Sequence, residues 1–112
     1  MLYRVIDAGE LPALVSAFME DYEVVAPTRR GRSFVFAAVG SFDEIALDYD
    51  TTITSPKKYF LPPVETLMRF DRRGNDVADF AEKVVPRVIF GAHACDINAL
   101  NRLDLTFRDG RY

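Results

Sequence analysis

Hydrophobic and polar positions in the first third of the chain predict one helix followed by a hairpin. Between residues 10 and 21, apolar side chains recur at helical spacing and form one stripe. Residues 22–27 and 33–39 are apolar runs on either side of a polar turn around Gly31, which is typical of two antiparallel strands. We expect Pro27 to end the first of these strands, because proline cannot donate to a strand ladder.

The middle of the chain carries weaker patterns. Residues 45–49 alternate well enough to predict a further strand. Residues 55–63 contain three prolines, and the residue before each proline is biased away from helix, which favours an extended, ordered loop. For residues 65–70 strand and helix both stay open, and for residues 77–84 the alternatives are a short helix and a loop.

The last third of the chain predicts a strand, a glycine-containing turn and a helix. Residues 86–91 form a β-branched and aromatic run that ends in glycine, and apolar residues recur at helical spacing within residues 95–104. Combined with the earlier elements, this unit predicts an α/β (α+β) fold. We expect a single compact domain with a mixed β-sheet and a few flanking helices, which suits a length of 112 residues.

Composition and charge restrict the class of protein. The chain is 49% hydrophobic and 28% charged, as in ordinary globular proteins, and its net charge of -3 provides no basic field for nucleic acid. Its single cysteine excludes an internal disulfide, the N-terminus lacks a signal-peptide pattern, and no apolar run reaches the length of a membrane span. We therefore expect a cytoplasmic protein with neither nucleic acid nor membrane as a partner.

Cys95 is the first candidate for chemistry, because it stands where the last strand gives way to a helix. Unpaired N–H groups and the helix dipole at such a position favour a thiolate, whereas the neighbouring Asp96 opposes it or caps the helix. The alternative is a small, buried and inert cysteine. His93 is the only histidine, and a local Cys–His pair without an orienting third group assigns no catalytic residue.

Zinc and iron–sulfur sites normally need more nitrogen and sulfur ligands than this chain contains. A tetrahedral zinc site normally takes more nitrogen and sulfur ligands than the one histidine and one cysteine of this chain supply, and an iron–sulfur cluster normally takes four cysteines. No metal site is therefore expected within this chain alone, and Cys95 would contribute at most one distal ligand to a cluster completed elsewhere.

The proline-rich loop is the second candidate. Its prolines lower the entropy that the loop loses on ordering, and Lys57, Lys58 and Tyr59 would then present charge and apolar surface to an acidic partner or an anionic ligand. The alternative is a surface connection whose aromatic side chains cover an edge of the core.

Two separated segments resemble a known family. Residues 55–67, SPKKYFLPPVETL, resemble the PKKYLLPP-x-E-x-L stretch of a family of iron–sulfur redox subunits. This family includes the beta subunits of cytoplasmic sulfhydrogenases and an iron–sulfur subunit of anaerobic sulfite reductase. Residues 91–104, GAHACDINALNRLD, are similar to its G-x-[RH]-x-CD-x-x-A-x-x-x-LD stretch, although Ala94 stands where many members have proline.

The resemblance implies that residues 1–112 are the N-terminal α/β domain of a longer 4Fe-4S dicluster subunit, whose cluster domain is absent from this chain. The alternative is a stand-alone relative that lost the cluster domain. It implies an electron-transport role in a hydrogenase- or sulfite-reductase-type oxidoreductase complex. This domain would position the cluster module and contact other subunits through Lys57, Lys58 and Tyr59, without being catalytic alone and without a cofactor of its own. The alternatives are a structural protein-interaction domain with no cofactor and a small flavin- or nucleotide-binding module.

Overall fold

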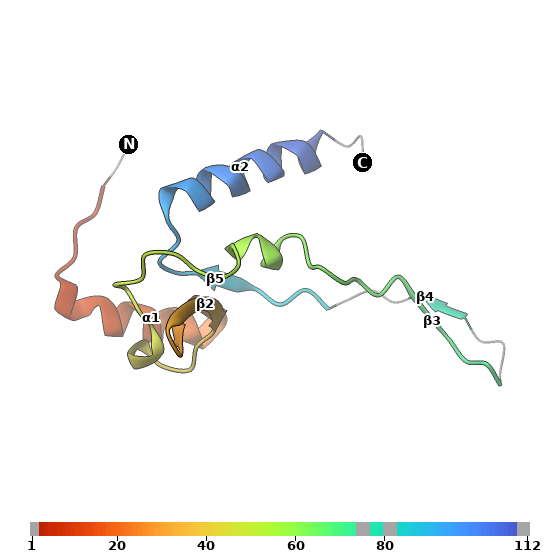
Figure 1. The fold of residues 1–112 in the computed structure, drawn as a ribbon, viewed down its shortest axis with the longest axis horizontal. Helices are drawn as coiled ribbons and strands as arrows, with labels where there is room; N and C mark the ends of the chain where they lie inside the picture. Colours follow the sequence, from red (N-terminus) through yellow and green to blue (C-terminus); the bar gives the residue numbers. More distant parts are fainter. Residues whose placement is uncertain (1–2, 74–76, 80–82, 110–112) are drawn as a thin grey trace.

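A mixed three-stranded sheet forms the centre of the computed structural model, which describes residues 3–73, 77–79 and 83–109 (Figure 1). The central strand β1 (Glu23–Arg30) pairs antiparallel with β2 (Ser33–Ala38) and parallel with β5 (Arg87–Ile89). A separate ribbon of β3 (Met68–Phe70) and β4 (Val77–Asp79) extends away from this sheet. Together with two α-helices, the mixed sheet confirms the predicted α+β class.

The N-terminal helix agrees with its apolar stripe. A short 3-10 helix η1 (Ala8–Glu10) leads into α1 (Leu11–Asp21), which carries proline in its first turn. Val15 of α1 is fully buried, and Phe18 and Met19 pack against the same cluster. The stripe predicted between residues 10 and 21 is therefore the face that α1 turns to the sheet.

Strand β1 runs past its proline, so the prediction that Pro27 ends the strand is wrong. Pro27 lies opposite Phe36 of β2, and its carbonyl accepts from the N–H of Ala46 at 2.8 Å, on the side away from β2. On that side the pairing with β5 finishes where the Phe90 N–H donates to the Val25 carbonyl at 2.8 Å. Beyond this point no neighbouring strand needs a donor from β1, and proline costs no ladder hydrogen bond.

The expected strand at residues 45–49 is also wrong. This segment follows the 3-10 helix η2 (Phe42–Glu44), and its Ala46 makes one backbone hydrogen bond to Pro27 of β1 without running alongside that strand. Ile45 packs against the cluster on one face of the sheet, Tyr49 is buried on the other, and Leu47 between them is 48% exposed, so the apolar alternation of this segment does not mark one face of a strand.

The proline-rich segment is only partly extended. Residues 56–59 form the 3-10 helix η3 (Pro56–Tyr59), because Pro56 fixes a helical φ and the Ser55 hydroxyl oxygen accepts from the Lys57 N–H at 3.3 Å. Farther along, only the last three of residues 65–70 form a strand, β3, and none of them is helical. The helix-or-loop expectation for residues 77–84 is wrong at β4, and residues 80–82 of it lie outside the described part of the chain.

The sheet separates two apolar clusters, because alternate residues of β1 point to opposite faces. One cluster contains Val15, Val24, Ala26 and Val39 and lies under α1. The other contains Val25, Phe36 and Tyr49, with Phe34, Tyr59 and Ile89 packed against it. Through Tyr59 and Ile89, this second cluster contacts η3 and the strand that leads into the last helix.

The last helix, α2 (Ala94–Arg108), follows β5 through a turn at Gly91. Gly91 has φ +77°, a left-handed conformation that L side chains rarely adopt, and a Cβ there would lie 3.4 Å from Cδ of Pro27. The helix contacts η3 and has no buried residue. Among the described residues, no helix is both long and apolar enough to cross a membrane.

Candidate functional site

The start of α2 brings three potential ligand side chains together. Cys95 is the second residue of α2, and His93 is the residue that precedes the helix. A ligand atom from each of His93, Cys95 and Asp96 lies within 4.8 Å of the other two. The three side chains expected from the sequence to share a neighbourhood therefore do so, at the positive end of a helix dipole.

Tyr49 anchors this cluster to the core. Its ring stacks on the imidazole of His93 with the ring centroids 4.4 Å apart and the planes 5° from parallel. Its hydroxyl donates to the carbonyl of Gly91 at 2.7 Å. Because the Tyr49 ring is itself packed edge-on against Phe36, the turn before Cys95 is tied to the centre of the sheet.

Ser55 fixes the other side of the cluster. Its hydroxyl donates to Oδ1 of Asp96 at 3.3 Å, while the Ser55 hydroxyl oxygen accepts from the N–H of Lys57 in η3. The interpretation of Asp96 as the helix cap is wrong, since His93 is the N-cap residue and makes no side-chain capping bond. Asp96 instead links α2 to η3.

A cavity of about 170 Å³ lies over the cluster. Its lining residues are Tyr49, Thr51, Thr52, Ser55, His93, Cys95 and Asp96. Burial raises the pKa of the Tyr49 hydroxyl, the negative charges of Asp96 and of a Cys95 thiolate raise it further, and the backbone at His93 opposes them. The hydroxyl therefore stays protonated and keeps its donor role toward Gly91 at neutral pH.

Cys95 is exposed, so the alternative of a buried cysteine is wrong. The thiol is reachable from solvent and from a partner, which a ligand to an external group must be. These three side chains do not make an iron–sulfur centre by themselves, because such a centre normally takes four cysteines and the chain has one. His93, Cys95 and Asp96 could contribute a ligand to an iron–sulfur site completed by another part of the protein, but they do not hold an iron–sulfur cluster by themselves.

The second set of predicted residues lies on η3, away from the cavity. The Lys58 ammonium and the Tyr59 hydroxyl both donate to the carbonyl of Phe36, at 2.6 and 3.1 Å. These two side chains are half-buried and fasten η3 to β2, whereas Lys57 is exposed. The contact of these three residues with a partner stays a prediction, and Lys57 is the residue among them whose charged side chain is exposed.

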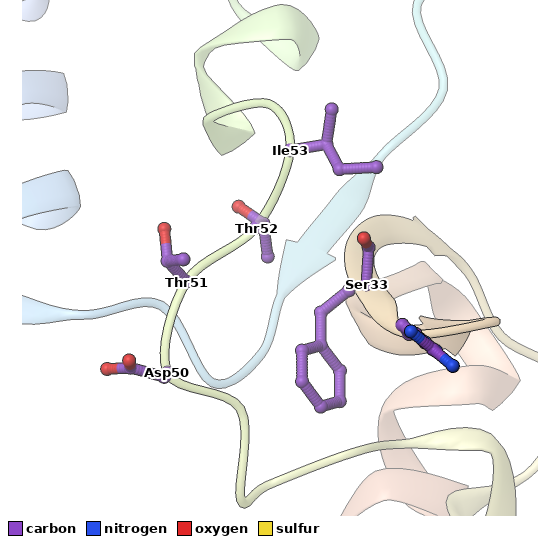
Figure 2. Close-up of a pocket in the computed structure, with 7 residues that line it drawn as sticks. Ser33, Asp50, Thr51, Thr52 and Ile53 are labelled. Carbon is purple, nitrogen blue, oxygen red and sulfur yellow. The ribbon is translucent and has the colours of Figure 1, made fainter.

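A larger hollow of about 310 Å³ separates the hairpin from the loop that follows Tyr49. Figure 2 shows Ser33 on the hairpin side and Asp50, Thr51 and Thr52 on the loop side. The carboxylate of Asp50 and the hydroxyl of Thr51 point away from the hairpin (Figure 2). Polar groups do not converge there, so the hollow is a weaker candidate than the cavity at Cys95.

Sequence reasoning identified His93, Cys95 and Asp96 but missed the two residues that hold them. Tyr49 carried a signal in the alternation of residues 45–49, which marked burial and was interpreted as a strand. Ser55 carried a signal as a serine directly before proline, a common start for a helical turn. Tyr49 contacts Gly91, which is 42 residues later, and Ser55 contacts Asp96, which is 41 residues later. No local sequence pattern indicates contacts of that separation.

The fold and the cluster define an α+β domain that presents one anchored, exposed cysteine at a helix N-terminus. In sequence, the chain is 31% identical over 107 residues to Sulfhydrogenase 2 subunit beta of Pyrococcus furiosus, a match that covers 96% of this chain. The chain spans 31% of the length of that relative. This similarity supports a relation to hydrogenase beta subunits. No family model matches the chain, and no solved structure matches it significantly.

Proposed function

We propose that this chain is the N-terminal domain of an iron–sulfur electron-transfer subunit in a cytoplasmic redox complex of hydrogenase or sulfite reductase type. The similarity to a sulfhydrogenase beta subunit carries the proposal. The exposed Cys95, held by Tyr49 and Ser55, adds a residue suited to it. The domain positions the cluster module and contacts partner subunits, and the chemistry of the complex takes place elsewhere.

Within this proposal, Cys95 supplies one thiolate to a [4Fe–4S] cluster whose other ligands lie outside this chain. The chemistry that such a cluster would supply is the transfer of single electrons. The contribution of this domain is a ligand on a rigid support: the Tyr49–His93 stack and the Ser55–Asp96 hydrogen bond fix the start of α2 from two sides. A ligand fixed in this way loses little conformational entropy when a cluster binds.

The ligand role is tested by Cys95→Ala in the complete subunit, purified without oxygen. We expect a lower iron content per polypeptide and a changed electron paramagnetic resonance spectrum of the reduced protein. Asn98→Ala, an exposed position one turn along α2, is the matched control and should leave both unchanged. If Cys95→Ala keeps the iron content, the spectrum and the reduction behaviour, Cys95 is not a ligand.

The docking role is tested by reversing the exposed charge of η3. Lys57→Glu should weaken association with the other subunits about fivefold, the effect of about 1 kcal/mol from one interface charge, and the loss should shrink at high salt. Arg102→Glu reverses a charge on the exposed side of α2 and serves as the control. Equal co-purification of subunits by both variants would remove Lys57 from the interface.

A further inference from the structure

A cationic hollow lies on the side of η3 that faces β5, apart from the cavity at Cys95. Its volume is about 380 Å³, and it shares no lining residue with that cavity. The lining residues are Lys58, Tyr59, Pro62, Lys83, Val84, Val85 and Arg87. Three of these seven carry a positive charge and none carries a negative one, in a chain whose net charge is -3.

Two of the three cations are held in place by one aromatic ring. The Lys58 ammonium lies 5.3 Å and the Arg87 guanidinium carbon 5.5 Å from the centroid of the Tyr59 ring. Lys58 also donates to the carbonyl of Phe36, and Arg87 Nε donates to the carboxylate of Glu23. Both side chains have therefore lost much of their rotamer freedom before any ligand arrives, which lowers the entropic cost of binding.

These anchors use only part of the donor capacity. An ammonium has three donors and a guanidinium has five, of which the Phe36 carbonyl and the Glu23 carboxylate engage one each. Burial and the charge of Glu23 raise the pKa of Tyr59, although Arg87 lowers it, so the phenol stays neutral beside the cations. The hollow therefore keeps a positive balance at neutral pH.

The remaining walls are apolar. Pro62, Val84 and Val85 contribute carbon surface, and Val84 is 87% exposed. A hollow of this volume lies in the range that small-molecule sites occupy, and such sites combine apolar walls with a few converging polar groups. Arginine and lysine are the residues that bind phosphate oxygens, by forked hydrogen bonds and by point charge respectively.

We propose that this hollow binds a small organic phosphate, with Lys58, Lys83 and Arg87 around the phosphate group and Pro62, Val84 and Val85 against its carbon skeleton. A phosphate monoester carries up to two negative charges at neutral pH and has three terminal oxygens, which matches three cations better than a carboxylate does. The inference shares Lys58 and Tyr59 with the proposed partner contact, but it does not depend on the electron-transfer role, because Lys83 and Arg87 have no part in that proposal.

Titration of the complete chain at constant ionic strength tests the inference. The probes are inorganic phosphate, FMN, and riboflavin, which has the ring system of FMN without the phosphate. Backbone amide chemical shifts of Tyr59, Val84 and Arg87 report occupancy. We expect saturable shifts with FMN, weaker binding of inorganic phosphate, and binding of riboflavin at least about tenfold weaker than that of FMN, as expected for a charged contact.

A pair of charge-removing variants separates the site from general attraction. Lys83→Gln should weaken FMN binding about tenfold, and Arg102→Gln, which removes an exposed charge on α2, should leave it unchanged. Equal thermal unfolding of both variants and the parent chain establishes that the fold is retained. The proposal is overturned if FMN and phosphate give no saturable shifts, if riboflavin binds as well as FMN, or if the two variants weaken binding equally.

Discussion

Removal of the Tyr49 hydroxyl is the most direct perturbation of the support beneath Cys95. Tyr49→Phe keeps the ring, its stack on His93 and its edge contact with Phe36, and it deletes only the donor to the carbonyl of Gly91. Tyr49→Leu removes the stack and the edge contact as well. The two variants together separate the contribution of the hydrogen bond from that of the ring.

The geometry sets the expected magnitudes. A hydrogen bond of 2.7 Å at the border of the core contributes about 1 kcal/mol net, so Tyr49→Phe should lower the free energy of unfolding by that amount. Tyr49 is 8% exposed, and replacing a buried aromatic ring by a smaller side chain costs about 2–4 kcal/mol. Since His93 is exposed, its stack contributes about 0.5–1 kcal/mol of this, which His93→Ala alone should reveal.

Urea unfolding followed by circular dichroism measures each free energy by linear extrapolation. A double-mutant cycle of Tyr49→Leu with His93→Ala should return a coupling of about 0.5–1 kcal/mol, because the stack exists only when both rings are present. A coupling of zero would show that the stack contributes nothing to stability. A Tyr49→Leu cost below about 1 kcal/mol would refute the assignment of Tyr49 to the core.

Three further predictions concern the backbone, the pH dependence and the thiol. Gly91→Ala and Gly31→Ala should each lower the free energy of unfolding in urea by about 1–2 kcal/mol, because φ is +77° at Gly91 and +62° at Gly31. An unchanged free energy at either position would contradict the left-handed backbone conformation there. The pKa values of Tyr49 and Tyr59 are raised in the folded chain, so the stability that results is present below pH about 10 and falls as the pH rises further. Unfolding curves at several pH values, combined with ultraviolet absorbance of the phenolates, measure this dependence. Titration of every tyrosine at the pKa of a free tyrosine would contradict it. Cys95 should react with a thiol reagent in the native chain within about tenfold of its rate in the unfolded chain, and much slower labelling would indicate burial.

The elements that sequence predicts correctly are those whose signals are local. Helix α1, the β1–β2 hairpin and the β5–α2 unit each have an apolar period, a glycine turn or both within one short segment. Each can therefore be recognised without knowledge of its neighbours. Position 95 also belongs to this group, because the change from strand to helix is visible in the sequence itself.

The errors arise where a distant segment decides the outcome. Pro27 is compatible with a strand only because β5 ends before it on the side of its missing N–H, and β5 is 60 residues later in the chain. Ile45 and Tyr49 contact opposite faces of a sheet to which their segment does not belong, so the apolar alternation at residues 45–49 does not indicate a strand. The residues that hold the site, Tyr49 and Ser55, escape prediction for the same reason.

The pairing of β1 with both a near and a distant strand also has a consequence for folding order. Strand β2 follows β1 across a two-residue turn, so this hairpin can form within about 1–10 μs. Glu23 finds its partner Arg87 only 64 residues farther along, and a contact of that separation must overcome a much larger loop-closure entropy. During synthesis the hairpin can therefore assemble long before β5 leaves the ribosome, and both the cysteine site and the cationic hollow are late products of chain growth.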